Sequence, residues 1–137
     1  MKKSKGFTLV ELIIVIVIVG ILSIVAVPIY RGYTKKAIAT EAKALLGSIA
    51  TAEKVYYAEF GQYFNVANDT DYIRELDVDS RSNKYFKKYK VTANNASANK
   101  SFTAESNGDA ATAANGIKLT LIAEENGAVT TSATGLD

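Results

Sequence analysis

The sequence predicts an α+β fold, in which one long N-terminal helix is followed by a three- or four-stranded antiparallel sheet. Two observations predict it. Apolar residues dominate the first thirty positions and continue at helical spacing to about residue 60. After residue 83, short stretches alternate between apolar and polar residues, with turn-forming residues between them. At 137 residues the chain is long enough for one modest core.

The N-terminal end of the chain predicts a segment that inserts into a membrane. The segment of residues 1–6 is short and basic, and the 19 residues from Leu12 to Tyr30 carry no charge. A helix of that length is about 28 Å long at ~1.5 Å per residue, close to the ~30 Å hydrocarbon thickness of a bilayer. The lysines at positions 2, 3 and 5 predict that the N-terminus stays in the cytoplasm.

Three other interpretations of this apolar run are weaker. A cleaved secretory signal has a shorter apolar core and a small-x-small cleavage site, but here only Ala26-Val27-Pro28 resembles one and a helical pattern continues beyond it. A buried helix of a soluble domain is rarely so long without a charge. A plain signal anchor fits the length and the flanking charge but does not explain Glu11.

Glu11 is the one acid within the apolar stretch. A carboxylate costs about 2.5–3.5 kcal/mol at the centre of a membrane helix and less near its end. Such a residue therefore either lies at headgroup depth or has a partner or function.

The run from Lys5 to Glu11, Lys-Gly-Phe-Thr-Leu-Val-Glu, resembles the prepilin motif of type IV pilins and type II secretion pseudopilins. The match is specific over residues 5–30 and loose afterwards. The resemblance implies that a prepilin peptidase removes residues 1–6, cutting between Gly6 and Phe7, and that Phe7 is then N-methylated. It also implies that Glu11 neutralises the new terminal amine of Phe7 in a neighbouring subunit, although the same pair could form within one chain.

Gly20 and Pro28 predict an interruption of this helix. Proline removes a backbone donor and clashes with the preceding turn, and glycine lowers helix propensity by about 1 kcal/mol relative to alanine. The resemblance implies that the stretch between them melts in assembled pili. Alternatively, small residues here permit close packing of helices.

Residues 31–60 are expected to form an amphipathic continuation of the assembly helix of residues 7–30. Leu46, Val55 and Tyr57 broaden its apolar stripe, and Gly61 is a suitable stop. The stripe itself comprises Ile38, Ala42, Leu45, Ile49, Ala52, Tyr56 and Phe60.

Residues 61–137 should hold the remaining loops and the sheet. Strands are expected over residues 85–93, 100–105, 117–123 and 128–132, with Glu125-Asn126-Gly127 as a hairpin turn. The composition of residues 94–116 predicts an exposed, variable loop region around Phe102. Four acids in the loop after residue 61 are weak candidates for a calcium site, although their spacing is not that of an EF-hand and they could simply be solvated. These are Asp69, Asp71, Asp77 and Asp79.

The composition gives little support to catalysis. The chain has no His, Cys or Trp, so histidine acid–base chemistry and thiolate nucleophiles are absent, and no spacing among the other polar residues suggests an active site. We expect neither an enzyme nor a bound cofactor. The net charge of +2 depends on the N-terminal lysines and does not indicate nucleic-acid binding.

The resemblance to pilins implies a structural subunit, a major pilin of a type IV pilus that serves adhesion, motility or DNA uptake. Its expected partners are copies of itself, the prepilin peptidase, the inner-membrane assembly machinery and the membrane. It would lie in the inner membrane before assembly and then in an extracellular fibre. A secretion-system pseudopilin and a signal-anchored surface binding protein remain the alternatives.

Overall fold

The structure is a computed structural model that describes residues 6–67 and 76–136. The chain divides into two compact units, residues 1–34 and residues 35–137. The first half of helix α1 lies in the N-terminal unit. The second half of α1 and the whole sheet lie in the C-terminal unit.

Helix α1 spans Leu9–Phe60 and confirms the predicted long helix. Gly61 follows it with a φ of +69°, a left-handed conformation that glycine adopts without a steric cost. Its N–H donates to the Tyr57 carbonyl at 2.8 Å and satisfies one of the last carbonyls of the helix.

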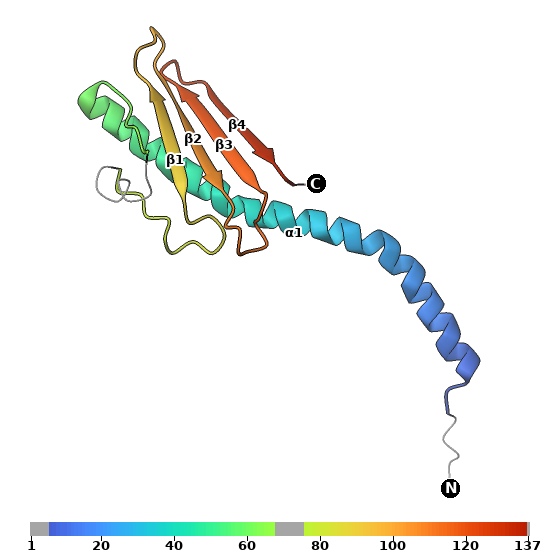
Figure 1. Ribbon diagram of the computed structural model, residues 1–137. Coiled ribbons are helices and arrows are strands. Elements are labelled where there is room, and N and C mark those ends of the chain that lie inside the picture. The colour runs from blue at the N-terminus through green and yellow to red at the C-terminus, as the bar shows by residue number, and fades with distance from the viewer. Residues whose placement is uncertain (1–5, 68–75, 137) are drawn as a thin grey trace. The chain divides into compact units, whose positions relative to one another are not determined.

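The four strands form one antiparallel sheet in the order β1-β2-β3-β4, which confirms the predicted α+β class (Figure 1). They are β1, Tyr89–Asn94; β2, Ser101–Asn107; β3, Lys118–Glu124; and β4, Val129–Thr134. Each strand pairs with the next one in the sequence, as Ala104 pairs with both Val91 and Leu121. Strand β4 is exposed along its whole length.

The core lies between the second half of α1 and one face of β1, β2 and β3. The predicted stripe is confirmed from Ile38 to Ile49, and Leu46 is buried beside it. The prediction is wrong at the far end, where Val55 is 63% and Phe60 56% exposed. The chain turns back after Gly61, so that Tyr63 enters the core.

Strand β1 begins at Tyr89, four residues later than the sequence predicts. The reason is Glu41 on α1, whose carboxylate accepts the backbone N–H groups of Lys84, Tyr85 and Phe86 at 3.1, 2.7 and 2.8 Å. Because these donors are taken by a side chain, the segment before Tyr89 is held against the helix rather than in the sheet.

The prediction of an exposed loop over residues 94–116 is wrong for its central part. Residues 101–107 form β2, an inner strand in which Phe102, Ala104 and Ser106 are buried. These three side chains alternate with partly exposed ones, so one face of the strand is turned towards the core. The Ser106 hydroxyl donates to the Lys88 carbonyl at 2.8 Å, which satisfies the one polar group that the strand buries.

Candidate functional site

The first turn of α1 is closed by a reciprocal pair of hydrogen bonds between Thr8 and Glu11. The Thr8 N–H donates to Glu11 Oε2 at 2.9 Å, and the Glu11 N–H donates to Thr8 Oγ1 at 3.3 Å. The Thr8 hydroxyl also donates to Oε2 at 2.7 Å. This is a capping box, which satisfies two backbone donors at a helix start. The spacing of Thr8 and Glu11 in the sequence is typical of a capping box, but the capping role of Glu11 was not predicted.

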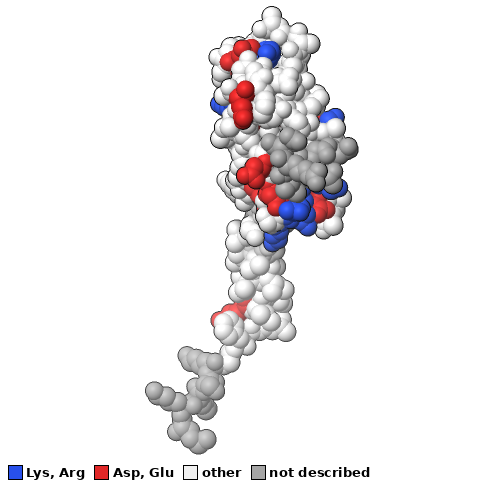
Figure 2. Space-filling view, turned by 90° about the vertical axis from the view of Figure 1, so that its left-hand side faces the viewer, with Lys and Arg blue, Asp and Glu red and all other residues white. Residues whose placement is uncertain are grey.

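Beyond the box, α1 presents an apolar surface all round. Its large apolar side chains from Leu9 to Ile29 are between 47% and 76% exposed. The core helix of a soluble domain would bury such residues, so this explanation of the run is excluded for the chain alone. By length and composition, α1 is a helix able to cross a membrane. In Figure 2 the start of α1 is almost entirely white on the face shown, with acidic atoms at one place.

The polar side chains in and beside this run bond to their own helix. The Ser23 hydroxyl donates to the Val19 carbonyl at 2.7 Å, and the Thr34 hydroxyl donates to the Tyr30 carbonyl at 2.9 Å. Neither hydroxyl therefore needs water, which suits an apolar environment. Pro28 lies inside α1, and no neighbouring side chain lies within 4 Å of where a Cβ on Gly20 would be.

The segment around the predicted cleavage point is accessible. Phe7 is 86% exposed, and a Cβ built on Gly6 would meet nothing within 4 Å. Gly6, Phe7 and Glu11 thus lie within one turn of the exposed start of α1.

The predicted calcium ligands are not brought together by the described residues. Asp69 and Asp71 lie outside the part of the chain that the structure describes. Asp79 accepts three hydrogen bonds from Arg81, at 2.8 to 3.0 Å, and this partner lowers its pKa to about 2. Over residues 6–67 and 76–136, no three acidic side chains converge as a metal site requires.

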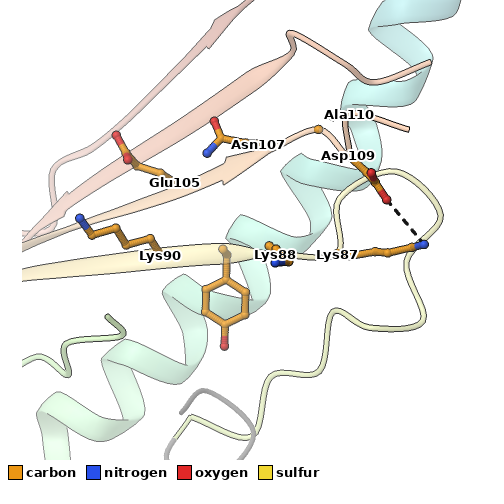
Figure 3. A pocket seen from close by; sticks show the side chains of 9 residues that line it. Lys87, Lys88, Lys90, Glu105, Asn107, Asp109 and Ala110 are labelled. Carbon is orange, nitrogen blue, oxygen red and sulfur yellow. Dashed lines mark ion pairs between the residues drawn. The ribbon is translucent and has the colours of Figure 1, made fainter. Parts of the chain in front are cut away.

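A pocket of about 390 Å³ lies beside the start of β1, lined by lysines from β1 and the segment before it and by acids from β2 and the loop after it (Figure 3). Both of its acids have a lysine partner: Asp109 lies 3.7 Å from Lys87, and Glu105 lies 2.7 Å from Lys118. The side chains that line the pocket provide no nucleophile beside a base.

A family model described as the prokaryotic N-terminal methylation motif matches residues 1–27. Residues 1–27 are thus similar to this motif. The match covers the basic start, the capping box and most of the apolar run. It confirms the resemblance that the residues from Lys5 to Glu11 indicate.

Relatives extend the similarity beyond the methylation motif. The chain is 35% identical over 91 residues to the type IV major pilin protein PilA of Myxococcus xanthus, which covers 66% of this chain and 38% of that protein. It is 41% identical over 85 residues to a fimbrial protein of Neisseria meningitidis serogroup A, covering 55% and 50%. A fimbrial protein of Pseudomonas aeruginosa is 38% identical over 71 residues, covering 52% and 46%. The chain thus spans half or less of the length of these relatives.

Proposed function

We propose that this chain is a structural subunit of a type IV pilus, a major pilin that polymerises through the N-terminal half of α1. The observation that carries the proposal is a methylation motif on a helix whose apolar surface is exposed on every side. Such a surface needs a bilayer before assembly and other helices after it, and copies of the same helix supply the second environment. The similarity to pilins and fimbrial proteins supports the same role.

Processing would generate the assembly-competent form. A prepilin peptidase would cut between Gly6 and Phe7 and the new terminus would be N-methylated on Phe7. The open surroundings of Gly6 and the exposure of Phe7 support access to this peptide bond. The N-terminus would face the cytoplasm in the inner membrane, and the finished fibre would lie at the cell surface.

Glu11 would then hold two partners at once. The bonds from Thr8 both use Oε2, so Oε1 is the atom that we propose accepts the terminal ammonium of a neighbouring subunit. Pairing the two charges offsets the cost of leaving either one alone in an apolar fibre core, and it would set the axial position of each subunit. Gly20 and Pro28 would let the intervening helix loosen within the fibre.

Three variants separate the charge from the cap. Glu11→Gln keeps a carbonyl oxygen for the Thr8 N–H but removes the charge, whereas Thr8→Ala removes the capping hydroxyl and keeps the carboxylate. Glu11→Ala removes both. We expect all three to insert into the membrane and to lose residues 1–6, as judged by mass spectrometry. Filaments, counted by electron microscopy, should be lost in both Glu11 variants and retained in Thr8→Ala. Normal filaments from Glu11→Gln would refute the charge pairing.

A further inference from the structure

Glu53 is a carboxylic acid inside the core. It lies one turn after Ile49 on the buried face of α1, and its relative exposure is 0%. The apolar stripe predicted from the sequence does not include Glu53, and an acid is rarely fully buried without a paired cation. No lysine or arginine pairs with it among the described residues.

The partner of Glu53 is a backbone group of the crossover segment, residues 61–66, which leads from the end of α1 towards the sheet. Glu53 Oε2 accepts the Phe64 N–H at 2.9 Å. The segment is attached to the sheet at its other end, where Val66 and Val91 exchange hydrogen bonds at 3.0 and 3.2 Å. The crossover segment therefore bridges the helix and β1, and Glu53 holds its middle.

Aromatic rings pack along the same segment. The Tyr57 ring stacks on Tyr63 with centroids 4.6 Å apart, and the Tyr56 ring lies 5.3 Å from Phe64. These contacts hold the side chains of the segment, whereas Glu53 holds its backbone. The carboxyl group of Glu53 is buried beneath this segment, and burial favours its neutral form.

The second oxygen, Glu53 Oε1, has no hydrogen-bond partner over residues 6–67 and 76–136. A buried carboxylate with one oxygen unsatisfied is costly, and a neutral carboxyl group in the same place costs much less. Burial raises the pKa of Glu53 from 4.5 to about 7, although the Phe64 N–H opposes the shift. The site thus changes charge near neutral pH.

Other titratable groups lie on the elements around Glu53. Tyr63 faces it from the crossover segment, and its pKa is raised by burial, by Glu125 and by Glu53. Tyr57, whose ring stacks on that of Tyr63, donates its hydroxyl hydrogen to Glu125 at 2.6 Å. Lys100 donates to the Gly61 carbonyl at 2.6 Å. The tyrosines are neutral near pH 7, so Glu53 is the member of this group whose charge changes there.

We propose that Glu53 is a proton-operated latch on the crossover segment: as the neutral acid it holds residues 61–66 against α1, and as the carboxylate it releases them. On ionisation the O–H bond of the carboxyl group breaks and its proton passes to bulk water. The charged group is then better solvated when the segment opens. The inference does not depend on the chain forming a filament.

The direction of the pH effect follows from the raised pKa. The closed form binds the proton more tightly than the open form, in which Glu53 has its ordinary pKa of 4.5. The stabilisation of the closed form is therefore complete below pH 4.5 and is lost as the pH rises to about 7. Between these values the open fraction should increase by roughly tenfold per pH unit, and it should level off above pH 7.

The first test is a titration of the full chain in neutral detergent micelles, with the glutamate carboxyl carbons labelled with ¹³C. The Glu53 resonance is identified by its absence in Glu53→Gln. We expect a midpoint near pH 7, well above the ordinary glutamate pKa of 4.5. A Glu53 midpoint near 4.5 would overturn the proposal without any need for a variant to fold.

The second test is amide hydrogen exchange from pH 5 to 8, with each rate divided by its intrinsic rate. Protection of the Phe64 amide relative to Leu121 in β3 should fall about fortyfold between pH 5 and 7 in the unmodified chain. Glu53→Gln, which keeps the carbonyl acceptor but cannot ionise, should show no such fall, and the matched control Glu59→Gln should keep it. Constant protection in the unmodified chain, or the same fall in Glu53→Gln, would show that Glu53 is not a latch.

Discussion

Glu41 and Tyr85 are 44 positions apart in the sequence, and the Glu41 Oε1 atom accepts the Tyr85 N–H at 2.7 Å. The same oxygen accepts the Phe86 N–H at 2.8 Å, and Oε2 accepts the Lys84 N–H at 3.1 Å. One helix side chain thus fixes the backbone of the three residues that lead into β1. Glu53 does the same for the Phe64 amide three turns further along α1.

Glu41→Ala should lower the free energy of unfolding by about 3 kcal/mol, because three backbone donors lose a charged acceptor together. Glu41→Gln retains one carbonyl oxygen, and we expect a loss of about 1 kcal/mol. Urea unfolding of the full chain in detergent micelles measures both. Glu59→Ala serves as the control and should stay within about 0.5 kcal/mol of the unmodified chain. A loss in Glu41→Ala no larger than in this control would show that Glu41 does not stabilise the segment before β1.

Two glycines should respond to alanine with opposite signs. Gly47 is an exposed helical residue at which a Cβ would meet nothing within 4 Å, so Gly47→Ala should stabilise the chain by about 0.5–1 kcal/mol. At Gly108 a Cβ would collide with the backbone carbonyl of Ala114, and Gly108→Ala should destabilise it by about 2–3 kcal/mol. Thermal unfolding of the two variants side by side checks the signs. Equal shifts would show that the loop around Gly108 yields more easily than its contacts indicate.

Tyr57 and Glu125 should titrate as a linked pair. The hydrogen bond to Glu125 raises the pKa of Tyr57 to about 12, and the same bond lowers the pKa of Glu125. The stabilisation by this bond is therefore present between the two pKa values, and it is lost in acid as Glu125 is protonated and in strong alkali as Tyr57 ionises. In Glu125→Ala, the Tyr57 midpoint measured by ¹³C NMR of the ring should fall towards 10.

The matched control for this pair is Glu124→Ala. Glu124 is the adjacent acid, but its Oε2 accepts from Asn99 and Asn126. The midpoint of Tyr57 should therefore stay near 12 in this variant. A shift of similar size in both variants would point to a general effect of negative charge rather than to the hydrogen bond.

The absence of cysteine from the chain permits a direct test of its orientation. Before assembly, a cysteine introduced by Ser132→Cys in β4 should react with a membrane-impermeant maleimide added outside the inner membrane, because β4 is exposed and belongs to the C-terminal unit. In the precursor that still carries residues 1–6, a cysteine introduced by Ser4→Cys should react only after the membrane is permeabilised. The reverse pattern would refute an N-terminus in the cytoplasm.

Periodicity and turn residues were enough to predict most of the fold. The helix to Phe60, its stop at Gly61 and the antiparallel hairpins depend on local preferences, which a short window of sequence contains. The start of β1 was wrong because it depends on Glu41, which is remote in the sequence. The strand predicted over residues 100–105 is confirmed as β2, but its burial was not predicted because Ala104 and Ser106 resemble the residues of an exposed loop.

Among the residues of interest, too, those that depend on neighbouring sequence could be predicted and those that depend on remote segments could not. Gly6, Phe7 and Glu11 could be proposed from the sequence because the motif is contiguous, and the capping box could have been predicted from Thr8-Leu-Val-Glu11. Glu53 could not, since an acid at that position reads as solvent-facing unless the path of the crossover segment over it is known. Its exposure is decided by residues 61–66, not by its own helical neighbours.

The sequential order of the strands has a consequence for how the protein reaches its folded state. The connections from β1 to β2, β2 to β3 and β3 to β4 contain only 6, 10 and 4 residues. Closing such short loops costs little chain entropy, so the sheet can form by successive hairpins while its distant contacts with α1 are still absent. We expect the slow step to be the docking of the finished sheet onto the helix. A newly made chain would then pair the backbone groups of its strands early. The apolar face of the sheet would be covered last, when α1 packs against it.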